Sequence, residues 1–379
     1  MLINEPGNIK WIDNDAQFSD MLDNILEQSI IGVDTESDSL YVYHEKVCLI
    51  QLSTTKVDYL VDPLKIKNLH PLIDVFFNEK IEKIFHAAEY DIMCLKRDFN
   101  FQFSNIFDTM IASRILGKSK FGLSNLLKEY FDLEINKKYQ RANWGRRPLS
   151  EDMINYASVD SHYLIALRNF LFQELVSKNL ISLADEDFNR ISNVESFQAH
   201  TTNDICWKMV KGNHLSLIQM TVLMELCNFR ENLAENKNIP AFKVIGPDVL
   251  IEIAKYCPKS IQDLSEINGV STKLINKYGI DLIKCVQNGM ANQPVSRQHK
   301  IRPSEAYLMR YESLKNWRKN KANTMGVESD VVLPKDLIDL ISTKNPNTKD
   351  DLQTIMHEVP YRFNRYSVEI LELLSNLEG

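Results

Sequence analysis

Residues 30–37 read IIGVDTES and place two acids inside a stretch that otherwise has the pattern of a buried strand. Side chains alternate between the two faces of a β-strand, so Gly32, Asp34 and Glu36 share one face. The two carboxylates then point the same way, roughly 7 Å apart along the strand. Gly32 has no side chain, which leaves room for a ligand beside them. The alternative, a solvent-facing strand that carries two charges, remains open on this segment alone.

The residues on both sides of this strand predict an α/β domain. Four further strand-like runs lie at 8–12, 47–53, 57–62 and 82–86, and helical spacing marks 13–28, 69–79 and the residues from Ala88 onward. After Phe107 the pattern is helical almost without interruption. Strands that first follow one another and then alternate with helices are typical of a mixed sheet flanked by helices.

The chain has 379 residues, of which 44% are hydrophobic, and this length allows two or three domains with separate cores. No apolar run reaches membrane-spanning length, and the amino terminus lacks the pattern of a secretion signal. The six cysteines show no C-x-x-C pairing, so we expect reduced cysteines in a cytoplasmic protein rather than a zinc site or a disulfide framework. A net charge of -7 argues against indiscriminate coating of nucleic acid. It does not exclude an acidic metal centre beside local basic patches.

Periodicity divides the chain into an α/β domain and two helical modules. We expect the α/β domain at residues 1–182, a polar linker that holds at most one short helix at 183–205, a first module at 206–290, a basic linker at 291–303 and a second module at 304–379. Each module begins with a long helical segment and continues with a short helix behind a proline, in GPDVLIEIA and LPKDLIDLI. This similarity predicts a weak internal repeat.

Two further acids occur where an inward-facing residue is expected. Asp160 lies in a helical segment, on the same apolar stripe as Tyr156 one turn earlier. An aspartate on a buried stripe needs a partner, and a cation supplies one. Asp91 lies near the start of a helix, where stabilisation of the helix dipole is the simpler explanation. Together with Asp34 and Glu36, however, these acids provide the oxygen-rich ligand set that Mg²⁺ or Mn²⁺ prefers.

Seven motifs follow one another along the chain, namely DTES, KVCLIQLS, IFHAAEYDIMCLKRDF, NIFDTMIASRIL, GLSNLLKEYF, RPLS and YASVDSHYL. In this order they resemble the tyrosine-bearing branch of the DEDD exonuclease superfamily, and more closely the ribonuclease D family. The helical modules resemble HRDC domains, the first well and the second more loosely. The resemblance implies a ribonuclease H-like α/β exonuclease domain followed by two all-α HRDC-type modules. Ser37 departs from the family, in which an aromatic residue is frequent there, and Asn143 stands where an aspartate is common.

The resemblance also implies a role for each motif. The expected catalytic set is Asp34, Glu36, Asp91, Tyr156 and Asp160, with the four acids as metal ligands. Asp108 and His86 are expected to support the site without binding metal. Two divalent cations, Mg²⁺ or Mn²⁺ about 3.5–4 Å apart, would activate water and neutralise the leaving 3′ oxygen. Because metal binding lowers the pKa of the water, Tyr156, with a reference pKa of about 10, is expected to orient the water rather than deprotonate it.

A basic segment, NKKYQRANWGRRPL, leads directly into the helix that carries Tyr156. Basic side chains hold phosphates and aromatic faces stack bases, so we expect this segment at the mouth of the site. The residues expected to contact nucleic acid are Lys137, Lys138, Arg141, Trp144, Arg146 and Arg147. The alternative is a solvated loop with one buried tryptophan. A second basic stretch, 296–321, is expected to contribute to a nucleic-acid surface.

These observations predict a cytoplasmic, metal-dependent 3′→5′ exoribonuclease that releases nucleoside 5′-monophosphates. The resemblance implies a substrate RNA with a single-stranded 3′ end, such as a tRNA precursor, and a monomeric protein that does not contact membranes. A DNA 3′→5′ exonuclease is one alternative, because contacts to the 2′-hydroxyl cannot be located in the sequence. A non-catalytic RNA-binding protein is the other, and the presence of all four acids and Tyr156 argues against it.

Overall fold

The computed structural model describes residues 8–197, 201–210, 214–295 and 303–377. Within these ranges the chain forms two compact units. One unit contains the described residues 8–37, 47–197 and 303–377, and the other contains 38–46 and the described residues between 201 and 295. The second helical module therefore belongs to the same compact unit as the α/β domain.

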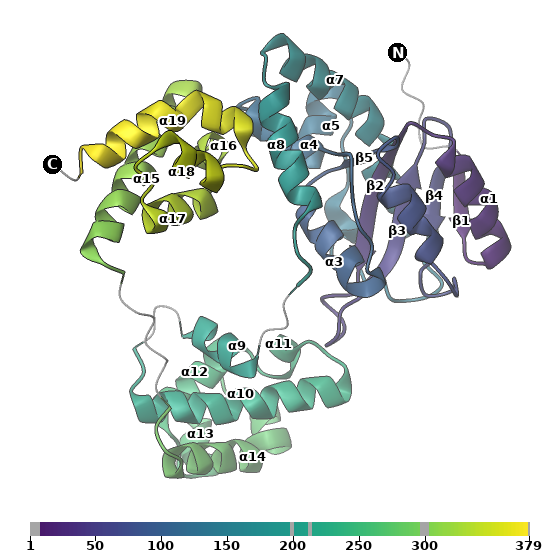
Figure 1. Cartoon of the computed structure of the whole chain (residues 1–379). Coiled ribbons are helices and arrows are strands. Elements are labelled where there is room, and N and C mark those ends of the chain that lie inside the picture. The colour runs from purple at the N-terminus through teal and green to yellow at the C-terminus, as the bar shows by residue number, and fades with distance from the viewer. Residues whose placement is uncertain (1–7, 198–200, 211–213, 296–302, 378–379) are drawn as a thin grey trace. The chain divides into compact units, whose positions relative to one another are not determined.

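A six-stranded mixed sheet lies at the centre of the first unit, in the order β1-β4-β3-β2-β5-β6. Its strands β1 to β5 are labelled in Figure 1. The strands are β1 (Ile9–Ile12), β2 (Ile30–Ser37), β3 (Val47–Ser53), β4 (Asp58–Val61), β5 (Glu82–Phe85) and β6 (Ile106–Asp108). β2 pairs antiparallel with β3 and parallel with β5, which places its acids in the middle of the sheet. The mixed sheet confirms the prediction. β6 is not among the predicted strands, because three residues are too few to display an alternating pattern.

Helices cover both faces of this sheet. They are α1 (Asp15–Leu26), η1 (His70–Leu72), α2 (Ile73–Phe76), α3 (Glu89–Phe99), α4 (Thr109–Ile115), α5 (Leu123–Phe131), η2 (Lys137–Tyr139), α6 (Glu151–His162), α7 (Leu164–Ser177) and α8 (Ile181–Ser192). On one face, Ile31 and Val33 of β2 share a core with Ile25 of α1 and Leu95 of α3. On the other face, Ile84 of β5 joins a core with the side chains of α4, α5, α7 and α8.

The segment 183–205, expected as a linker, begins within α8. Leu183, Ala184 and Phe188 of this helix are buried in the core beneath β5 and β6. These apolar positions are separated by acids and asparagines, which gives the segment its polar composition. A helix that buries one face and exposes the other can therefore be mistaken for a linker.

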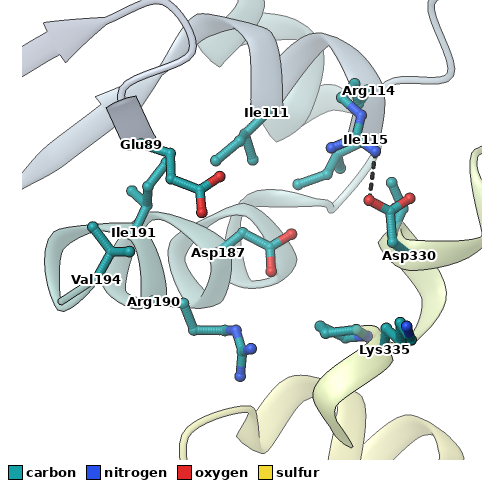
Figure 2. A pocket seen from close by; sticks show the side chains of 12 residues that line it. Glu89, Ile111, Arg114, Ile115, Asp187, Arg190, Ile191, Val194, Asp330 and Lys335 are labelled. Atoms are coloured by element: carbon teal, nitrogen blue, oxygen red, sulfur yellow. Dashed lines mark hydrogen bonds and ion pairs between the residues drawn. The ribbon is translucent and has the colours of Figure 1, made fainter. Parts of the chain in front are cut away.

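The second helical module packs against the α/β domain through ion pairs. Its helices are α15 (Glu305–Met325), α16 (Ser329–Val332), α17 (Lys335–Lys344), α18 (Lys349–Ile355) and α19 (Pro360–Ser375). Arg362 of α19 is fully buried and donates to Glu186 and Asp187 of α8, at 2.9 Å each. Figure 2 shows a second pair, Arg114 of α4 with Asp330 of α16, at the rim of a pocket between the two parts.

The other unit is helical and contains α9 (Thr202–Met209), α10 (Leu217–Lys237), α11 (Ala241–Val244), α12 (Pro247–Tyr256), α13 (Ile261–Ser265) and α14 (Thr272–Ala291). α10 and α14 approach so closely that a methyl group at Gly289 would lie 2.5 Å from the Cα of Val222. The structure joins Cys206 and Cys227 as a disulfide, whereas the sequence predicts reduced cysteines. None of the described helices combines the length and apolar character that a membrane crossing requires.

Candidate functional site

Three acids meet where β2 faces α6. Oxygen atoms of Asp34, Glu36 and Asp160 all lie within 4.8 Å of one another, and the three side chains are partly buried. Asp34 and Glu36 share one face of β2, as the alternation of the strand predicts. Asp160 comes from the last turn of α6. Two elements more than 100 residues apart in the chain thus supply one cluster of carboxylates.

Gly32 explains how α6 comes so close to β2. A methyl group at this position would lie 2.4 Å from the backbone oxygen of Ser161. The space beside the acids, which the sequence analysis assigns to a ligand, is therefore filled by the backbone of α6. A glycine inside a strand allows such a close approach of another backbone. Because Ser161 follows Asp160, the contact at Gly32 sets the distance between the two sets of acids.

Asp91 lies beside this cluster and is held separately. It is 9% exposed, near the start of α3, and accepts a hydrogen bond from the hydroxyl of Thr35. Burial raises the pKa of Asp91 to about 7, although the hydrogen bond from Thr35 opposes this shift. The charge of Asp91 also contributes to the raised pKa of Asp34, so the two carboxylates are close enough to interact.

Burial and mutual repulsion make the cluster unfavourable for free carboxylates. Burial, followed by the charges of the neighbouring acids, raises the pKa of Asp34 and of Glu36 well above the ordinary range. Burial raises the pKa of Asp160 to about 7. Like charges in a poorly solvated site favour either protons or a cation. A donor set made of carboxylate oxygens alone fits a hard divalent cation such as Mg²⁺ or Mn²⁺.

Tyr156 lies one turn earlier in α6, where its hydroxyl is close enough to Asp160, Glu36 and Asp34 to feel their charges. Burial and the neighbouring negative charges raise its pKa, so the hydroxyl keeps its proton at neutral pH. Its ring neighbours those of Trp144 and Tyr139, whose centroids are each 6.1 Å away. The phenol therefore keeps its proton beside the acids and can donate a hydrogen bond.

Asp108 and His86 occupy supporting positions behind Asp91. The buried carboxylate of Asp108 accepts from the backbone amides of Ala87 and Ala88, at 3.2 and 2.7 Å, and caps α4. Ala87 has a φ of 64°, an unusual value for a residue with a side chain, and these hydrogen bonds hold the turn that leads into α3. His86 is joined to Thr109 at 2.9 Å.

The basic segment before α6 divides into two groups. Lys137, Lys138, Arg141 and Arg146 are exposed. Arg147, by contrast, donates two hydrogen bonds to the buried Asp62, at 2.6 and 2.8 Å, and others to backbone carbonyls.

Trp144 is 1% exposed and packs among apolar residues of β3, β4 and α6. Neither Arg147 nor Trp144 is placed to contact RNA in this structure, in contrast to the prediction. The alternative of one buried tryptophan describes the loop better.

Side chains of the second basic stretch are also engaged within the protein. Arg310 and Arg318 donate to backbone carbonyls of their own module, and Lys315 and Lys321 pair with Glu312 and Glu369. The residues from Ser296 to Arg302 lie outside the described part of the chain. The described part of this stretch therefore fixes the fold of the module more than it offers free charge to nucleic acid.

Sequence reasoning missed two side chains that touch the acids. Thr35 binds Asp91, and Gln51 of β3 donates from Nε2 to Asp34 Oδ2 at 3.4 Å. A polar residue within the apolar run VCLIQLS was the available signal for Gln51. His162, which follows the cluster in α6, binds the buried Asp58 at 2.8 Å and is structural.

Comparisons with known proteins identify the architecture. Residues 9–176 match the 3'-5' exonuclease family, and residues 219–286 and 308–374 each match the HRDC domain. A ribonuclease D from Desulfotalea psychrophila is 30% identical over 288 residues, which cover 75% of this chain and 76% of that protein. The chain belongs to the ribonuclease D family. With the exonuclease match, this makes it a 3′-5′ exoribonuclease and confirms the predicted exonuclease domain followed by HRDC modules.

Solved structures share the fold of this chain. The catalytic core of RRP6 from Trypanosoma brucei is 26% identical, with a TM-score of 0.67 over 77% of this chain and 84% of that chain. Escherichia coli RNase D, an exoribonuclease involved in structured RNA processing, reaches a TM-score of 0.68 over 93% of this chain and 99% of its own. At 20% identity, the latter supports the fold alone.

Proposed function

We propose that this ribonuclease D family member is a metal-dependent enzyme that removes nucleoside 5′-monophosphates one at a time from the single-stranded 3′ end of RNA. The observation that carries the proposal is the group of three carboxylates, from β2 and α6, whose oxygens lie within 4.8 Å of one another. A cation relieves the repulsion between them. The natural substrates we propose are tRNA precursors, processed by a monomeric enzyme in the cytoplasm.

Two cations would share the acids. Asp34, Glu36 and Asp160 would hold one of them, and Asp91 would hold the second together with Asp34. Bound divalent cations supply a water that ionises near neutral pH and positive charge for the leaving oxygen. The hydroxyl of Thr35 donates to Oδ1 of Asp91 and would hold this carboxylate in place for a cation.

Tyr156 would orient the attacking water. Its hydroxyl lies beside Asp160 and stays protonated at neutral pH, so it can donate a hydrogen bond to an oxygen in the site. The neighbouring rings of Trp144 and Tyr139 would limit the movement of the phenol. Removal of the hydroxyl alone is therefore expected to lower kcat more than it weakens RNA binding.

The single-stranded 3′ tail would approach along the exposed part of the basic segment. Lys137, Lys138, Arg141 and Arg146 offer charge to phosphates within the segment that runs into α6. Such contacts do not distinguish bases, which suits an enzyme that shortens RNA of varied sequence. Discrimination against DNA requires contact with the 2′-hydroxyl.

The testing experiment follows a 5′-labelled RNA with a single-stranded 3′ tail in Mg²⁺, Mn²⁺ or EDTA. Wild type is expected to produce a ladder of products that shorten by one nucleotide in either metal and none in EDTA. Asp160→Asn is expected to abolish the ladder and still bind the RNA. Glu151→Gln, an exposed substitution in the first turn of the same helix, is the matched control and should retain activity.

Other results would point to a different function. Equal or faster shortening of a DNA strand of the same sequence would favour a DNA exonuclease. RNA binding without cleavage in both metals would favour a binding protein. Activity that survives Asp160→Asn would show that the three-acid cluster is not the catalytic centre.

A further inference from the structure

Gln51 is a buried amide next to the acid cluster. It lies on β3 directly opposite Asp34 of β2 and is 0% exposed. Its Nε2 donates to Asp34 Oδ2 at 3.4 Å. Residues directly opposite each other in an antiparallel pair point to the same face of the sheet. Gln51 therefore shares the face of the sheet on which Asp34 and Glu36 meet α6.

The orientation of this amide follows from its partner. With a cation bound, Asp34 is ionised and only accepts hydrogen bonds, so the nitrogen of Gln51 faces it, as in the structure. The oxygen Oε1 is then buried, and among the described residues none donates to it. A buried acceptor without a donor is unfavourable, and a water molecule is the usual donor where protein supplies none.

The neighbouring polar residue on β3 has a different task. Ser53, two residues farther along the same face, is 0% exposed, and its hydroxyl hydrogen-bonds that of Ser161 at 2.7 Å. Ser53 thus holds α6 and has its partner within the protein. Gln51 holds a carboxylate and presents an acceptor whose partner is absent from the protein. Of the two residues, only Gln51 has a hydrogen-bond acceptor without a donor.

We propose that Gln51 is a positioning residue for the cation site: Nε2 fixes the carboxylate of Asp34, and Oε1 accepts a hydrogen bond from a water of the cation's hydration shell. This inference rests on the proposed metal-dependent function. It assigns to β3 a part in cation binding that the four acids alone do not show. Groups that orient a metal ligand by hydrogen bonding commonly change metal affinity about 10- to 100-fold when they are removed.

The test measures Mn²⁺ binding by titration calorimetry in the absence of RNA, for the wild-type protein, Gln51→Met and Gln51→Leu. Both substitutions introduce an apolar side chain of similar size and remove the hydrogen-bond donor and the acceptor of the amide together. We expect Mn²⁺ to bind the variants at least about 10-fold more weakly than wild type. Gln28→Met is the matched control, since the Gln28 amide donates to Asn24 in α1 and should not affect Mn²⁺ binding.

The unfolding temperature in EDTA separates positioning from a structural role. Removal of a donor together with an unsatisfied acceptor should leave this temperature unchanged or higher, while the rise caused by Mn²⁺ becomes smaller. A lower unfolding temperature in EDTA with unchanged Mn²⁺ affinity would overturn the inference and make Gln51 a packing residue. If wild type itself fails to bind Mn²⁺, the proposed function fails. If wild type and both Gln51 variants bind equally, only this inference fails.

Discussion

The contact between β2 and α6 makes Gly32→Ala the most informative single substitution in this protein. The added methyl group would lie 2.4 Å from the backbone oxygen of Ser161, whereas ordinary contacts of this kind begin at 3.4 Å. The strand and the helix must therefore separate by roughly 1 Å. The obstacle is backbone rather than the end of a flexible side chain, so no rotamer change relieves it.

This separation acts directly on the catalytic geometry. Asp34 and Glu36 stay with the strand, while Asp160 moves with the helix. A misplacement of about 1 Å commonly costs about 100-fold in rate. Overpacking of this kind costs roughly 1–3 kcal/mol of stability, which leaves most domains folded. We therefore expect a folded variant with kcat/KM for RNA lowered about 100-fold and with weaker Mn²⁺ binding.

The assay compares single-nucleotide release by Gly32→Ala and Gly122→Ala, after circular dichroism has shown that both are folded. A methyl group at Gly122 would meet its nearest neighbour at 3.6 Å, and the backbone there has a φ of -72°, so this control should behave like wild type. A folded Gly32→Ala protein with wild-type kcat/KM would refute the argument that this glycine sets the distance between the acids.

Three further outcomes are expected. Arg362→Met should lower the free energy of unfolding by about 3–5 kcal/mol in a denaturant titration, because it leaves Glu186 buried without its partner, whereas the exposed Arg365→Met should change it little. In EDTA the unfolding temperature should fall as the pH rises from 5 to 8, because burial raises the pKa of Asp160 to about 7 and the folded protein binds a proton that the unfolded chain has lost. Asp160→Asn should flatten this dependence. An unfolding temperature that rises with pH would contradict it. Lys138→Gln should weaken RNA binding at every sequence and reduce the slope of log K against log salt by about 0.7, and an unchanged slope would show that Lys138 does not contact a phosphate.

Those features of the site that lie within a single strand or helix could be predicted from the sequence. Alternation along β2 correctly placed Asp34 and Glu36 on one face, and helical spacing put Tyr156 and Asp160 side by side. Both are short-range regularities, which one strand or one helix contains by itself. The meeting of the strand with the helix depends on Gly32 and on the register of the sheet, which no local pattern contains. The resemblance to a family supplied that long-range step.

Trp144 and Arg147 show why the nucleic-acid contacts were harder to predict. A segment rich in lysine, arginine and aromatic residues has the composition of a binding loop, but composition does not tell which charges are already satisfied. The partner that removes Arg147 from the surface is Asp62, 85 residues earlier in the chain. Trp144 is buried against β3 and β4, which the loop reaches only in the folded protein. Exposure is thus decided by partners that lie outside the segment.

Partners outside a segment also distinguish the two HRDC modules, which have similar sequence patterns. Each begins with a long helix, but their partners outside the repeat differ. Arg362 ties the second module to α8 of the exonuclease domain through buried ion pairs. The first module instead packs with residues 38–46, where Lys243 lies 4.4 Å from the ring of Tyr41. The partner of the first module is thus a segment that directly follows β2 in the chain, whereas the partner of the second is the helix α8.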